Sequence, residues 1–245
     1  MTRKEFSEGF DTLVNSYRRF RGFDNQEAID SIEFNEFEKS FFLTKAQESL
    51  VEDLYSGKNI DNESYEETER LRRSLAELNV EKTYSPTTSN TSYPIDSSSK
   101  FFKLDNNLMF ITYEAVIPSA DAGDCLAGKM VETVPVRQDW YHRQVKNPFR
   151  GVSAKRALRL DRSNHVVEIV YPQGISKYYV RYVRRPQPII LEALPNNLTI
   201  DGNGGPSDCE LDKILHQKIL ERAVILGLTS KGRGPRERNE NTNNN

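Results

Sequence analysis

Helical patterns stand at the two ends of this chain, and a strand-rich region separates them. Near the start, Phe6, Phe10 and Val14 recur every four residues, and the run from Asp208 to Gly227 carries apolar residues at spacings of three and four. A helix with one apolar stripe has to bury that stripe against another element. We therefore expect an α+β fold in which the N- and C-terminal helices form one helical bundle, with a β-rich insertion domain between them and a flexible C-terminal tail.

The first 80 residues are predicted to supply the N-terminal helices of the bundle. A second helix is expected from Asn35 to Tyr55, because Asn35 and Glu38 have the spacing of a capping box and Gly57 is a helix-ending residue. A third, more polar helix is predicted over residues 64–78. The expected apolar stripes of the first two helices are Phe6, Phe10, Leu13, Val14 and Tyr17, and Phe42, Ala46, Leu50 and Leu54.

The closing bundle helix, predicted over residues 207–228, has the clearest signals. Asp208 is a residue type favoured at a helix N-cap, and Gly227 is one favoured at a helix C-terminus. We expect Leu215 and Ile219 to be buried against the N-terminal helices. The full stripe is Leu211, Leu215, Ile219, Ala223 and Leu226, widened by Ile214 and Val224. Residues 229–245 are polar, which predicts an extended tail that is either mobile or laid along a neighbouring protein.

Strands are predicted within a β-rich insertion domain over residues 101–206. The strand segments are Phe101–Leu104, Leu108–Val116, Glu132–Val136, His165–Tyr171 and Lys177–Val183. A turn at Pro172–Gly174 separates the last two, so we expect them to pair as a hairpin. The Ser-, Thr- and Asn-rich stretch 81–100 is interpreted as a polar linker, or equally as a partly ordered surface loop.

Charge is distributed unevenly along the chain, although the formal net charge is only −2. Residues 1–100 hold 13 Lys and Arg against 20 Asp and Glu, and residues 137–185 hold 12 against 3. Three interpretations stay open: a basic solvated sheet face, docking of the acidic helical part of one copy on the basic β part of another, or contact with nucleic acid. Complementary fields of this kind steer association and fix its register.

The sequence contains no catalytic or metal-binding motif. His142, His165 and His216 do not have the spacing of a metal motif, and Cys125 and Cys209 lie too far apart to complete one. Phosphate-loop and nucleophile-elbow patterns are also missing from the sequence. We therefore expect no enzyme activity, no metal and no cofactor. No apolar run approaches the length of a membrane span, so membrane contact is not expected either.

Nucleic-acid binding is the second function class that the residues suggest. Aromatic and basic residues alternate from Trp140 to Arg162, and this mixture suits stacking together with phosphate contact. The candidate contacts to DNA or to a neighbouring protein are Arg143, Lys146, Arg150, Lys155 and Arg156. The sequence pI of about 6.0 is well below that of a dedicated nucleic-acid binder, so a secondary, sequence-independent role is favoured.

Two segments resemble the head–tail connector, or ring, proteins of crAss-like tailed phages. Residues Glu36 to Leu54 (EFEKSFFLTKAQESLVEDL) resemble the family pattern YEKS-FLT-AQ-E-V. The run YYVRYVRRPQPIIL and the later DCELDKILHQKILERAVILG resemble its Y-V-YL-RP-PI-L and CEL-ELH-EI---AV patterns. The match covers both ends, residues 81–176 match in layout alone, and the Asn-rich stretch NENTNNN has no counterpart. The layout also looks like that of the adaptor and tail-tube gatekeeper proteins of short-tailed phages.

The resemblance implies a virion structural protein, made in the host cytoplasm and located at the portal vertex or tail. It implies a portal-proximal head–tail connector ring of twelve copies, with the portal protein and adjacent ring or tail proteins as partners and genomic DNA in the lumen without sequence specificity. A non-specific nucleic-acid-binding accessory protein is the alternative. The candidate residues for docking on a neighbour are Arg181, Arg184, Arg185, Pro186, Lys231, Arg233, Arg236 and Arg238.

Overall fold

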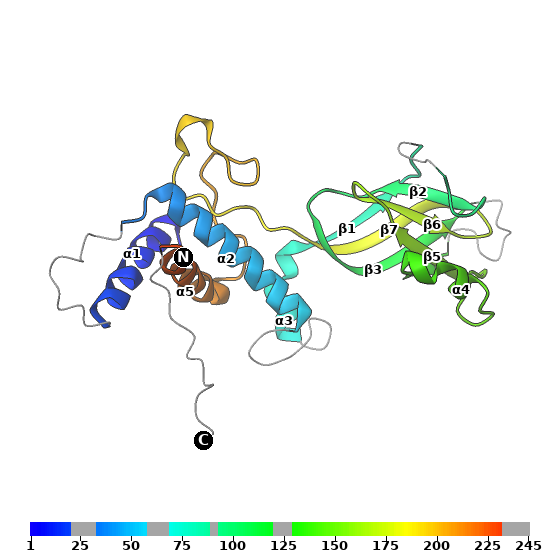
Figure 1. Cartoon of the computed structure of the whole chain (residues 1–245), viewed down its shortest axis with the longest axis horizontal. Coiled ribbons are helices and arrows are strands. Elements are labelled where there is room, and N and C mark those ends of the chain that lie inside the picture. Colours follow the sequence, from blue (N-terminus) through cyan, green and yellow to red (C-terminus); the bar gives the residue numbers. More distant parts are fainter. Residues whose placement is uncertain (21–32, 58–68, 89–92, 120–128, 232–245) are drawn as a thin grey trace, which may run out of the picture. The chain divides into compact units, whose positions relative to one another are not determined.

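The computed structural model describes residues 1–20, 33–57, 69–88, 93–119 and 129–231. The chain divides into two compact units: a helical unit of residues 1–78 and 186–245, and a sheet unit of residues 79–185. Among the described residues the fold is mixed α+β, with five α-helices and one seven-stranded sheet (Figure 1). The segment 186–206, which the sequence analysis assigned to the β-rich domain, groups with the helices.

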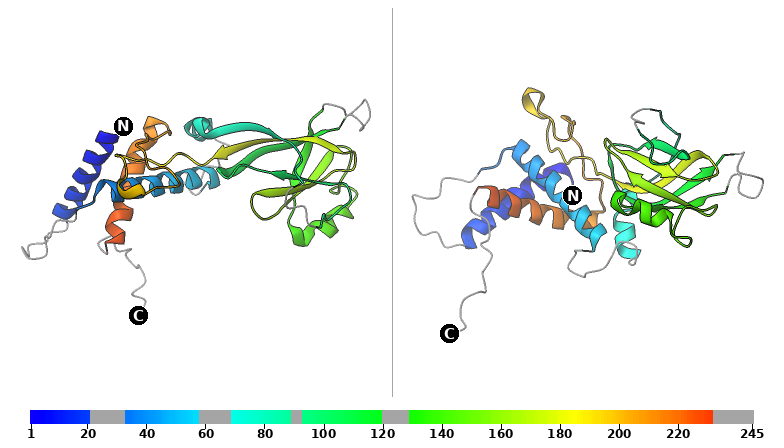
Figure 2. Two further views of the ribbon diagram at one scale, coloured as in Figure 1. Left: turned by 90° about the horizontal axis from the view of Figure 1, so that it is seen from above. Right: turned by 45° about the vertical axis from the view of Figure 1, so that its right-hand side comes forward.

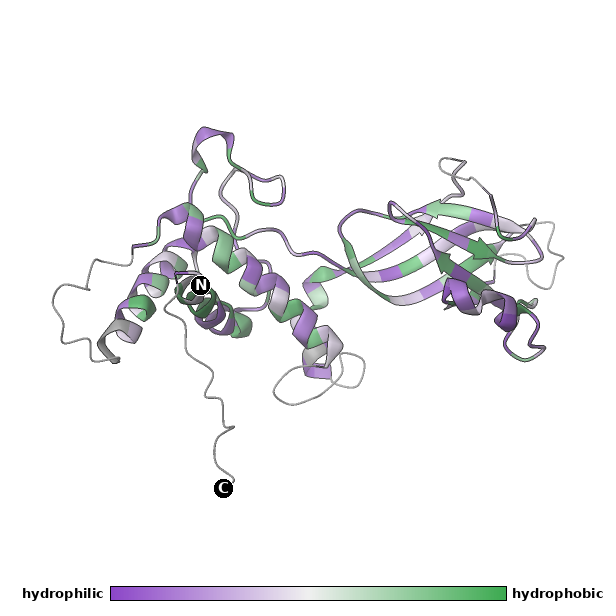
Figure 3. Cartoon of the chain, in the orientation of Figure 1, coloured by the Kyte–Doolittle hydropathy of each residue, from purple (hydrophilic) through white to green (hydrophobic). Residues whose placement is uncertain are grey.

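Three long helices form the helical unit: α1 (Arg3–Phe20), α2 (Glu36–Ser56) and α5 (Lys213–Ser230). Helix α5 packs against both α1 and α2, and it buries Leu215 and Ile219 as predicted. Figure 3 shows how apolar and polar residues alternate along these helices, as amphipathic helices require. Their buried apolar side chains are Phe6, Phe10, Val14, Leu43, Ala46, Leu50, Val51, Leu54, Leu215, Ile219, Leu220, Ala223, Val224 and Leu228.

The start of α2 confirms the predicted capping box. The Asn35 Oδ1 atom accepts a hydrogen bond from the Glu38 N–H at 2.8 Å, and the Glu38 Oε2 atom accepts one from the Asn35 N–H at 3.0 Å. Gly57 ends the helix in the left-handed conformation, with φ 74°. A third helix, α3 (Glu69–Ser74), is followed by a 3-10 turn (Ala76–Leu78), so the helix predicted over residues 64–78 ends earlier than expected; residues 58–68 lie outside the described residues.

Both predicted ends of α5 are wrong. Asp212, not Asp208, is the N-cap, and its Oδ1 atom accepts a hydrogen bond from the Ile214 N–H at 3.0 Å. Gly227 does not end the helix, which continues to Ser230. A Cβ atom at Gly227 would lie 3.1 Å from the Phe34 ring, so the glycine permits close packing between elements instead.

The ends of the predicted apolar stripe on α5 are also corrected. Ile214 is 77% exposed and Leu226 is 38% exposed, whereas the intervening positions are buried. The predicted tail therefore begins inside the helix at Thr229, and residues 232–245 lie outside the described residues.

The sheet unit is one curled sheet with the strand order β1-β7-β3-β4-β5-β6-β2 among the described residues (Figure 2). Neighbouring strands are antiparallel except for the parallel pair β4 and β5. The two edges approach each other, because Thr87, which follows β1, forms a bridge with Phe101 on β2. The strands are β1 (Asn79–Tyr84), β2 (Ser99–Lys103), β3 (Leu108–Pro118), β4 (Val131–Pro135), β5 (Arg156–Asp161), β6 (Val166–Val170) and β7 (Ile175–Arg184).

The predicted hairpin between the last two strands is wrong. Strand β6 pairs with β5 and β2, whereas β7 pairs with β1 and β3. Gly174 does adopt a positive φ of 75°, as the turn requires. Side chains of both strands, such as Ile169 and Tyr178, join the same hydrophobic core. Two strands that face one core show the same alternation of apolar residues whether or not they are hydrogen-bonded to each other, so the pattern did not reveal which strands pair.

Two strands lie in segments where none was predicted. Strand β1 includes residues 81–84 of the predicted polar linker, and β2 begins at Ser99, within its last residues. Strand β5 lies inside the basic segment that follows Asp139. Its residues Ala157, Leu158, Arg159 and Leu160 are all buried, because one face joins the sheet core and the other is covered by helix α4 (Tyr141–Val145).

Candidate functional site

The basic and aromatic residues singled out in the sequence gather on one excursion of the sheet unit. This excursion, residues 137–156, is called the α4 knob, and it holds six Lys and Arg against one Asp. It consists of a 3-10 turn (Gln138–Trp140), helix α4 and the turn that leads into β5. Tyr141 is buried against Leu158, Leu160 and Val170, which fixes the knob to the outer face of the sheet.

Hydrogen bonds fix the backbone at the tip of the knob. The Asn147 Oδ1 atom accepts from the N–H groups of Phe149 and Arg150 at 2.9 and 3.2 Å. The Phe149 carbonyl accepts from Arg156 Nη1 at 2.8 Å, and the Arg150 carbonyl accepts from Gln144 Nε2 at 3.0 Å. All four backbone polar groups of this dipeptide therefore have partners within the knob, and only the two side chains remain for contacts outside it.

Gly151 is required by the same turn. It is buried, and a Cβ atom there would lie 2.7 Å from the Asn147 carbonyl oxygen and 2.8 Å from the Val145 carbonyl oxygen. Because both atoms belong to the backbone, a side chain at this position would displace the turn.

Two large aromatic side chains project from the knob. Phe149 is 87% exposed and Trp140 is 52% exposed. The Arg143 guanidinium lies 5.6 Å from the centre of the Trp140 ring, within range of a cation–π contact. An exposed aromatic ring on a fixed turn loses no backbone freedom when it is buried by a partner.

Several arginines of the sheet unit outside the knob have carboxylate partners within the chain. Arg159 lies 3.1 Å from Glu114, Arg181 lies 3.0 Å from Glu81, and Arg162 is paired with Glu168. Lys82 also has a carboxylate partner, and within the knob Arg137 pairs with Asp139. Within the part of the chain that the structure describes, no carboxylate pairs with the four exposed cations of the knob, which are Arg143, Lys146, Arg150 and Lys155.

Arg156, predicted as a contact to DNA or to a neighbouring protein, has partners within the knob and the sheet. Its Nη1 atom holds the Phe149 carbonyl, and its Nε atom lies 4.0 Å from the Glu132 carboxylate. It is half-buried and supports the tip, whereas the other four candidate contacts face solvent.

Arg181, a candidate interface residue, is engaged by its own sheet. Its Nε atom donates to the Tyr179 hydroxyl at 2.7 Å and lies 3.0 Å from Glu81. The guanidinium also lies 5.7 and 5.6 Å from the centres of the Tyr113 and Tyr179 rings. Its charge is therefore already countered within one chain.

The remaining candidate interface residues are scattered. Arg184 and Arg185 lie at and just after the end of β7, and Pro186 is buried. Lys231 follows α5: its Nζ atom donates to the Glu33 carbonyl at 2.8 Å and lies 3.3 Å from Glu38. Arg233, Arg236 and Arg238 lie outside the described residues.

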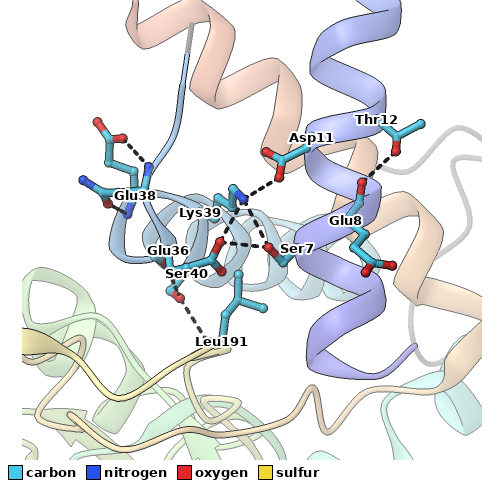
Figure 4. A network of polar contacts seen from close by, with 10 residues as sticks. Ser7, Glu8, Asp11, Thr12, Glu36, Glu38, Lys39, Ser40 and Leu191 are labelled. Atoms are coloured by element: carbon cyan, nitrogen blue, oxygen red, sulfur yellow. Dashed lines mark hydrogen bonds and ion pairs between the residues drawn. The ribbon is translucent and has the colours of Figure 1, made fainter.

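A buried ion cluster joins α1 to α2 in the helical unit (Figure 4). Lys39 is only 4% exposed, and its Nζ atom donates to Asp11 at 2.7 Å, Glu36 at 2.9 Å and Ser7 at 3.1 Å. Burial lowers the pKa of Lys39, but the hydrogen bonds to Asp11 and Glu36 outweigh it and raise the pKa above its usual value.

Next to this cluster, polar side chains of α2 bind the backbone of an extended segment, residues 187–191. The Leu191 N–H donates to Ser40 Oγ at 3.0 Å (Figure 4), and the Ile189 N–H donates to Thr44 Oγ1 at 3.1 Å. Gln47 extends the row by donating from Nε2 to the Gln187 carbonyl at 2.8 Å. We call Ser40, Thr44 and Gln47 the polar ladder; all three are buried.

The other side of this segment is held by residues that precede α5. Glu210 accepts from the Gln187 N–H at 2.9 Å, and Ile190 and Ser207 exchange backbone hydrogen bonds. Burial raises the pKa of the Cys209 thiol to about 11, and this thiol donates to Gln47 Oε1 at 3.2 Å. The thiol is therefore a structural donor and not an activated nucleophile.

Sequence reasoning missed the function of the polar ladder, although its residues stood in the quoted patterns. Lys39, Ser40, Thr44 and Gln47 interrupt the apolar spacing of α2, and the predicted stripe passed over them. A buried helix face with polar residues at such intervals indicates that the partner is a backbone and not another apolar side chain. The polar residues were visible in the sequence, but their burial was not.

The described residues show no sign of metal chemistry or of a membrane span. No three His, Cys, Asp or Glu side chains among them are grouped closely enough to hold a metal ion. No helix in the described part of the chain has both the length and the apolarity needed to cross a bilayer.

Comparisons with known proteins place the chain in a family. A family model described as Phage tail ring protein 3/4 matches residues 1–239. Ring protein 3 of Bacteroides phage crAss001 is 42% identical over 233 residues, which cover 94% of this chain and 96% of the relative. Ring protein 4/5 of the same phage is 31% identical over 240 residues, with 92% of each chain covered. The chain belongs to the phage tail ring protein 3/4 family and is a ring protein of the crAss-like phage type.

Proposed function

We propose that this protein is a structural subunit of a closed ring in the phage particle, without enzymatic activity. The supporting observation is that charge separates by structural unit. The helical unit holds 18 Lys and Arg against 26 Asp and Glu, a balance of −8, and the sheet unit holds 16 against 10, a balance of +6. In a ring of identical copies each interface joins two different surfaces, so opposite charges on two units of one chain favour that arrangement.

The copy number, position and partners proposed here are those that the resemblance to head–tail connector proteins implies. The ring has twelve copies, lies next to the portal and joins it to the tail, with genomic DNA passing through the lumen. The helices of both chain ends form the ring's bundle, and the sheet unit is its insertion. The portal protein and adjacent ring or tail proteins are the proposed neighbours.

Measuring the mass and shape of the purified protein tests this proposal. We expect closed rings in negative-stain electron micrographs and a mass that is a fixed multiple of the monomer, alone or after mixing with portal protein. Salt should shift the equilibrium toward monomer, because exposed charges about 10 Å apart are largely screened at 0.1 M ionic strength. Particles that never close, with or without portal, would contradict the proposal.

The tail beyond Ser230 is proposed to lie along an adjacent protein. Its cations are Lys231, Arg233, Arg236 and Arg238; Lys231 is already engaged by Glu33 and Glu38 of its own chain, so the three arginines would supply the charge for docking. Truncation of the chain after Ser230 should leave folding of the monomer intact. It should weaken attachment of the phage tail to the phage head. Particles that assemble and retain DNA normally without these residues would show that the tail has no docking role.

Nucleic-acid binding remains the second candidate function, because exposed rings and cations stand together on the α4 knob. Fluorescence anisotropy with labelled duplex and single-stranded DNA tests it. Binding by the monomer that falls steeply with salt and with substitution of Arg143 and Arg150 would support this function.

A further inference from the structure

We propose that the α4 knob is the anchor by which the sheet unit of one copy docks on the acidic helical unit of the next copy. The inference rests on the proposed ring and identifies which surface closes it. Its starting point is the tip dipeptide Phe149-Arg150, whose backbone groups are all satisfied internally while its side chains face outward.

The composition of the knob matches the centre of a protein interface. Aromatic residues and Arg contribute most of the binding free energy in such interfaces. Their contribution is largest where the side chain fills a pocket on the partner. Phe149 at 87% exposure and Trp140 at 52% are large apolar surfaces left in water by the isolated chain. A fixed turn presents them in one geometry, so little conformational freedom is lost on docking.

Charge identifies the partner. The knob's four exposed cations have no carboxylate partner in the described residues, and the helical unit of the same sequence, with a balance of −8, offers a complementary charge. Pairing a basic surface with an acidic one of another copy steers association and excludes contacts between two sheet units.

The helical unit has two grooves whose walls hold more acidic than basic residues and that could receive an aromatic side chain. One, of about 410 Å³, is lined by the acidic residues Glu77, Glu210 and Asp212 and the basic residues Arg73 and Lys213, beside Leu211. The other, of about 710 Å³, is lined by the acidic residues Glu8, Glu36, Glu192 and Asp208 and the basic residues Arg3 and Lys4, beside Leu191. Each groove holds a carboxylate without a cation partner in the described residues, Glu77 in the first and Glu192 in the second, that could meet the knob's cations.

Duplex DNA fits the knob less well. Phosphates would pair with Arg143 and Lys146, but a duplex backbone offers no pocket for a ring such as that of Phe149. Aromatic side chains stack on bases where the strands are unpaired. The exposed rings therefore favour a protein partner over duplex DNA.

Site-specific photo-crosslinking in the full chain tests the proposal. A benzophenone amino acid replaces Phe149, and the modified chain is mixed with isotope-labelled wild type under assembly conditions. We expect crosslinked peptides that join position 149 to residues 1–78 or 186–231 of a different copy. The matched control carries the same group at Tyr93, another aromatic residue of the sheet unit, which is 90% exposed but lies off the knob; it should give few such crosslinks.

A second measurement compares two charge reversals of equal size. R143E/K146E/R150E alters the knob, and K100E/K129E/K177E alters exposed lysines elsewhere on the sheet unit. The first should raise the protein concentration needed for half-assembly by about tenfold or more, and the second by much less, because like charges placed opposite each other oppose docking. Circular dichroism confirms that both variants are folded.

The crosslinking and assembly experiments can fail in ways that distinguish the docking role of the knob from ring formation itself. Rings that form normally with the knob reversed, or crosslinks to another sheet unit or to added DNA, would overturn the docking role while leaving the ring intact. A wild-type protein that forms no ring under any condition would contradict the proposed function itself. Equal loss of assembly in the two reversals would show a general charge effect and also overturn the anchor.

Discussion

Lys39 is a buried cation held between α1 and α2, and its surroundings determine what its removal costs. Lys39→Met leaves Glu36 and Asp11 without their shared partner, so we expect a loss of about 3 kcal/mol in the free energy of unfolding, the lower end of the range for a broken buried pair because Asp11 is half exposed. Urea unfolding followed by circular dichroism measures it.

Lys45→Met is the matched control for this change. Lys45 lies on the same helix and pairs with Glu48 at 2.8 Å, but its side chain is 42% exposed. Exposed pairs contribute about 0–1 kcal/mol, so its loss should be much smaller. Equal losses in the free energy of unfolding for the two variants would mean that the buried Lys39 cluster stabilises the protein no more than an exposed ion pair does.

His216 should make the helical unit sensitive to mild acid. Burial lowers the pKa of His216, and Nε2 donates to the Leu211 carbonyl at 2.9 Å. The folded state therefore favours the neutral ring, whereas the unfolded chain protonates near its ordinary pKa of 6.5. Between these two pKa values the unfolded state binds more protons, so stability falls as pH drops below about 6.5.

The pH dependence is checked by urea unfolding at pH 7.5, 6.5 and 5.5. The wild type should lose stability across this range, and His216→Gln should lose less. The same slope in both proteins would assign the effect to other titrating groups.

At the scale of elements, the polar ladder makes α2 specific for one extended segment. Thr44→Val keeps the shape of the side chain but removes the acceptor for the Ile189 N–H, which is buried. A buried donor left without a partner costs about 1–3 kcal/mol, so we expect a loss of that size in thermal or urea unfolding.

The control for the ladder is Thr12→Val. The Thr12 hydroxyl donates to the Glu8 carbonyl of its own helix at 2.7 Å in an exposed position, so its removal should change stability by less than about 0.5 kcal/mol. If both variants are equally stable, water must replace the ladder's hydrogen bond, and the ladder does not set specificity.

Elements with local signals could be predicted, and elements defined by distant partners could not. The capping box at Asn35 and the turn at Gly174 depend on neighbours in sequence, and both are present. The partners of β6 and β7 depend on how the sheet curls, which no alternation pattern encodes. Strand β1 was missed because only Val80 and Tyr84 in NVEKTY are apolar or aromatic, and residues 81–83 of this edge strand are exposed.

The candidate site shows the same division. The run of aromatic and basic residues from Trp140 identified the knob, because exposed functional side chains are visible in composition. The sequence did not show which cations have carboxylate partners. Arg159 meets Glu114, and Arg181 meets Glu81, only because the sheet brings distant residues together. The same limit hid the role of Arg156, which resembles its basic neighbours in sequence but supports the tip in the fold.

At the scale of the whole molecule, the sheet unit should fold without the helical unit. Its main hydrophobic core, from Tyr84 to Tyr182, lies entirely within residues 79–185. We expect a fragment of these residues to unfold cooperatively on heating. A fragment of residues 86–185 is the control: it lacks β1, leaves one edge of β7 unpaired and should be markedly less stable. If the longer fragment is also unfolded, the sheet unit depends on the helices.

Asn79 and Val183 are paired residues on neighbouring antiparallel strands, so the chain enters and leaves the sheet unit at points about 5 Å apart. An inserted domain whose two ends are adjacent can change in shape or be exchanged without altering the distance between the segments that flank it. Mutations in the α4 knob can accumulate without disturbing the ion cluster or the polar ladder. If the α4 knob is the docking surface proposed above, the family could change its neighbours through the sheet unit while the helical unit keeps the common architecture.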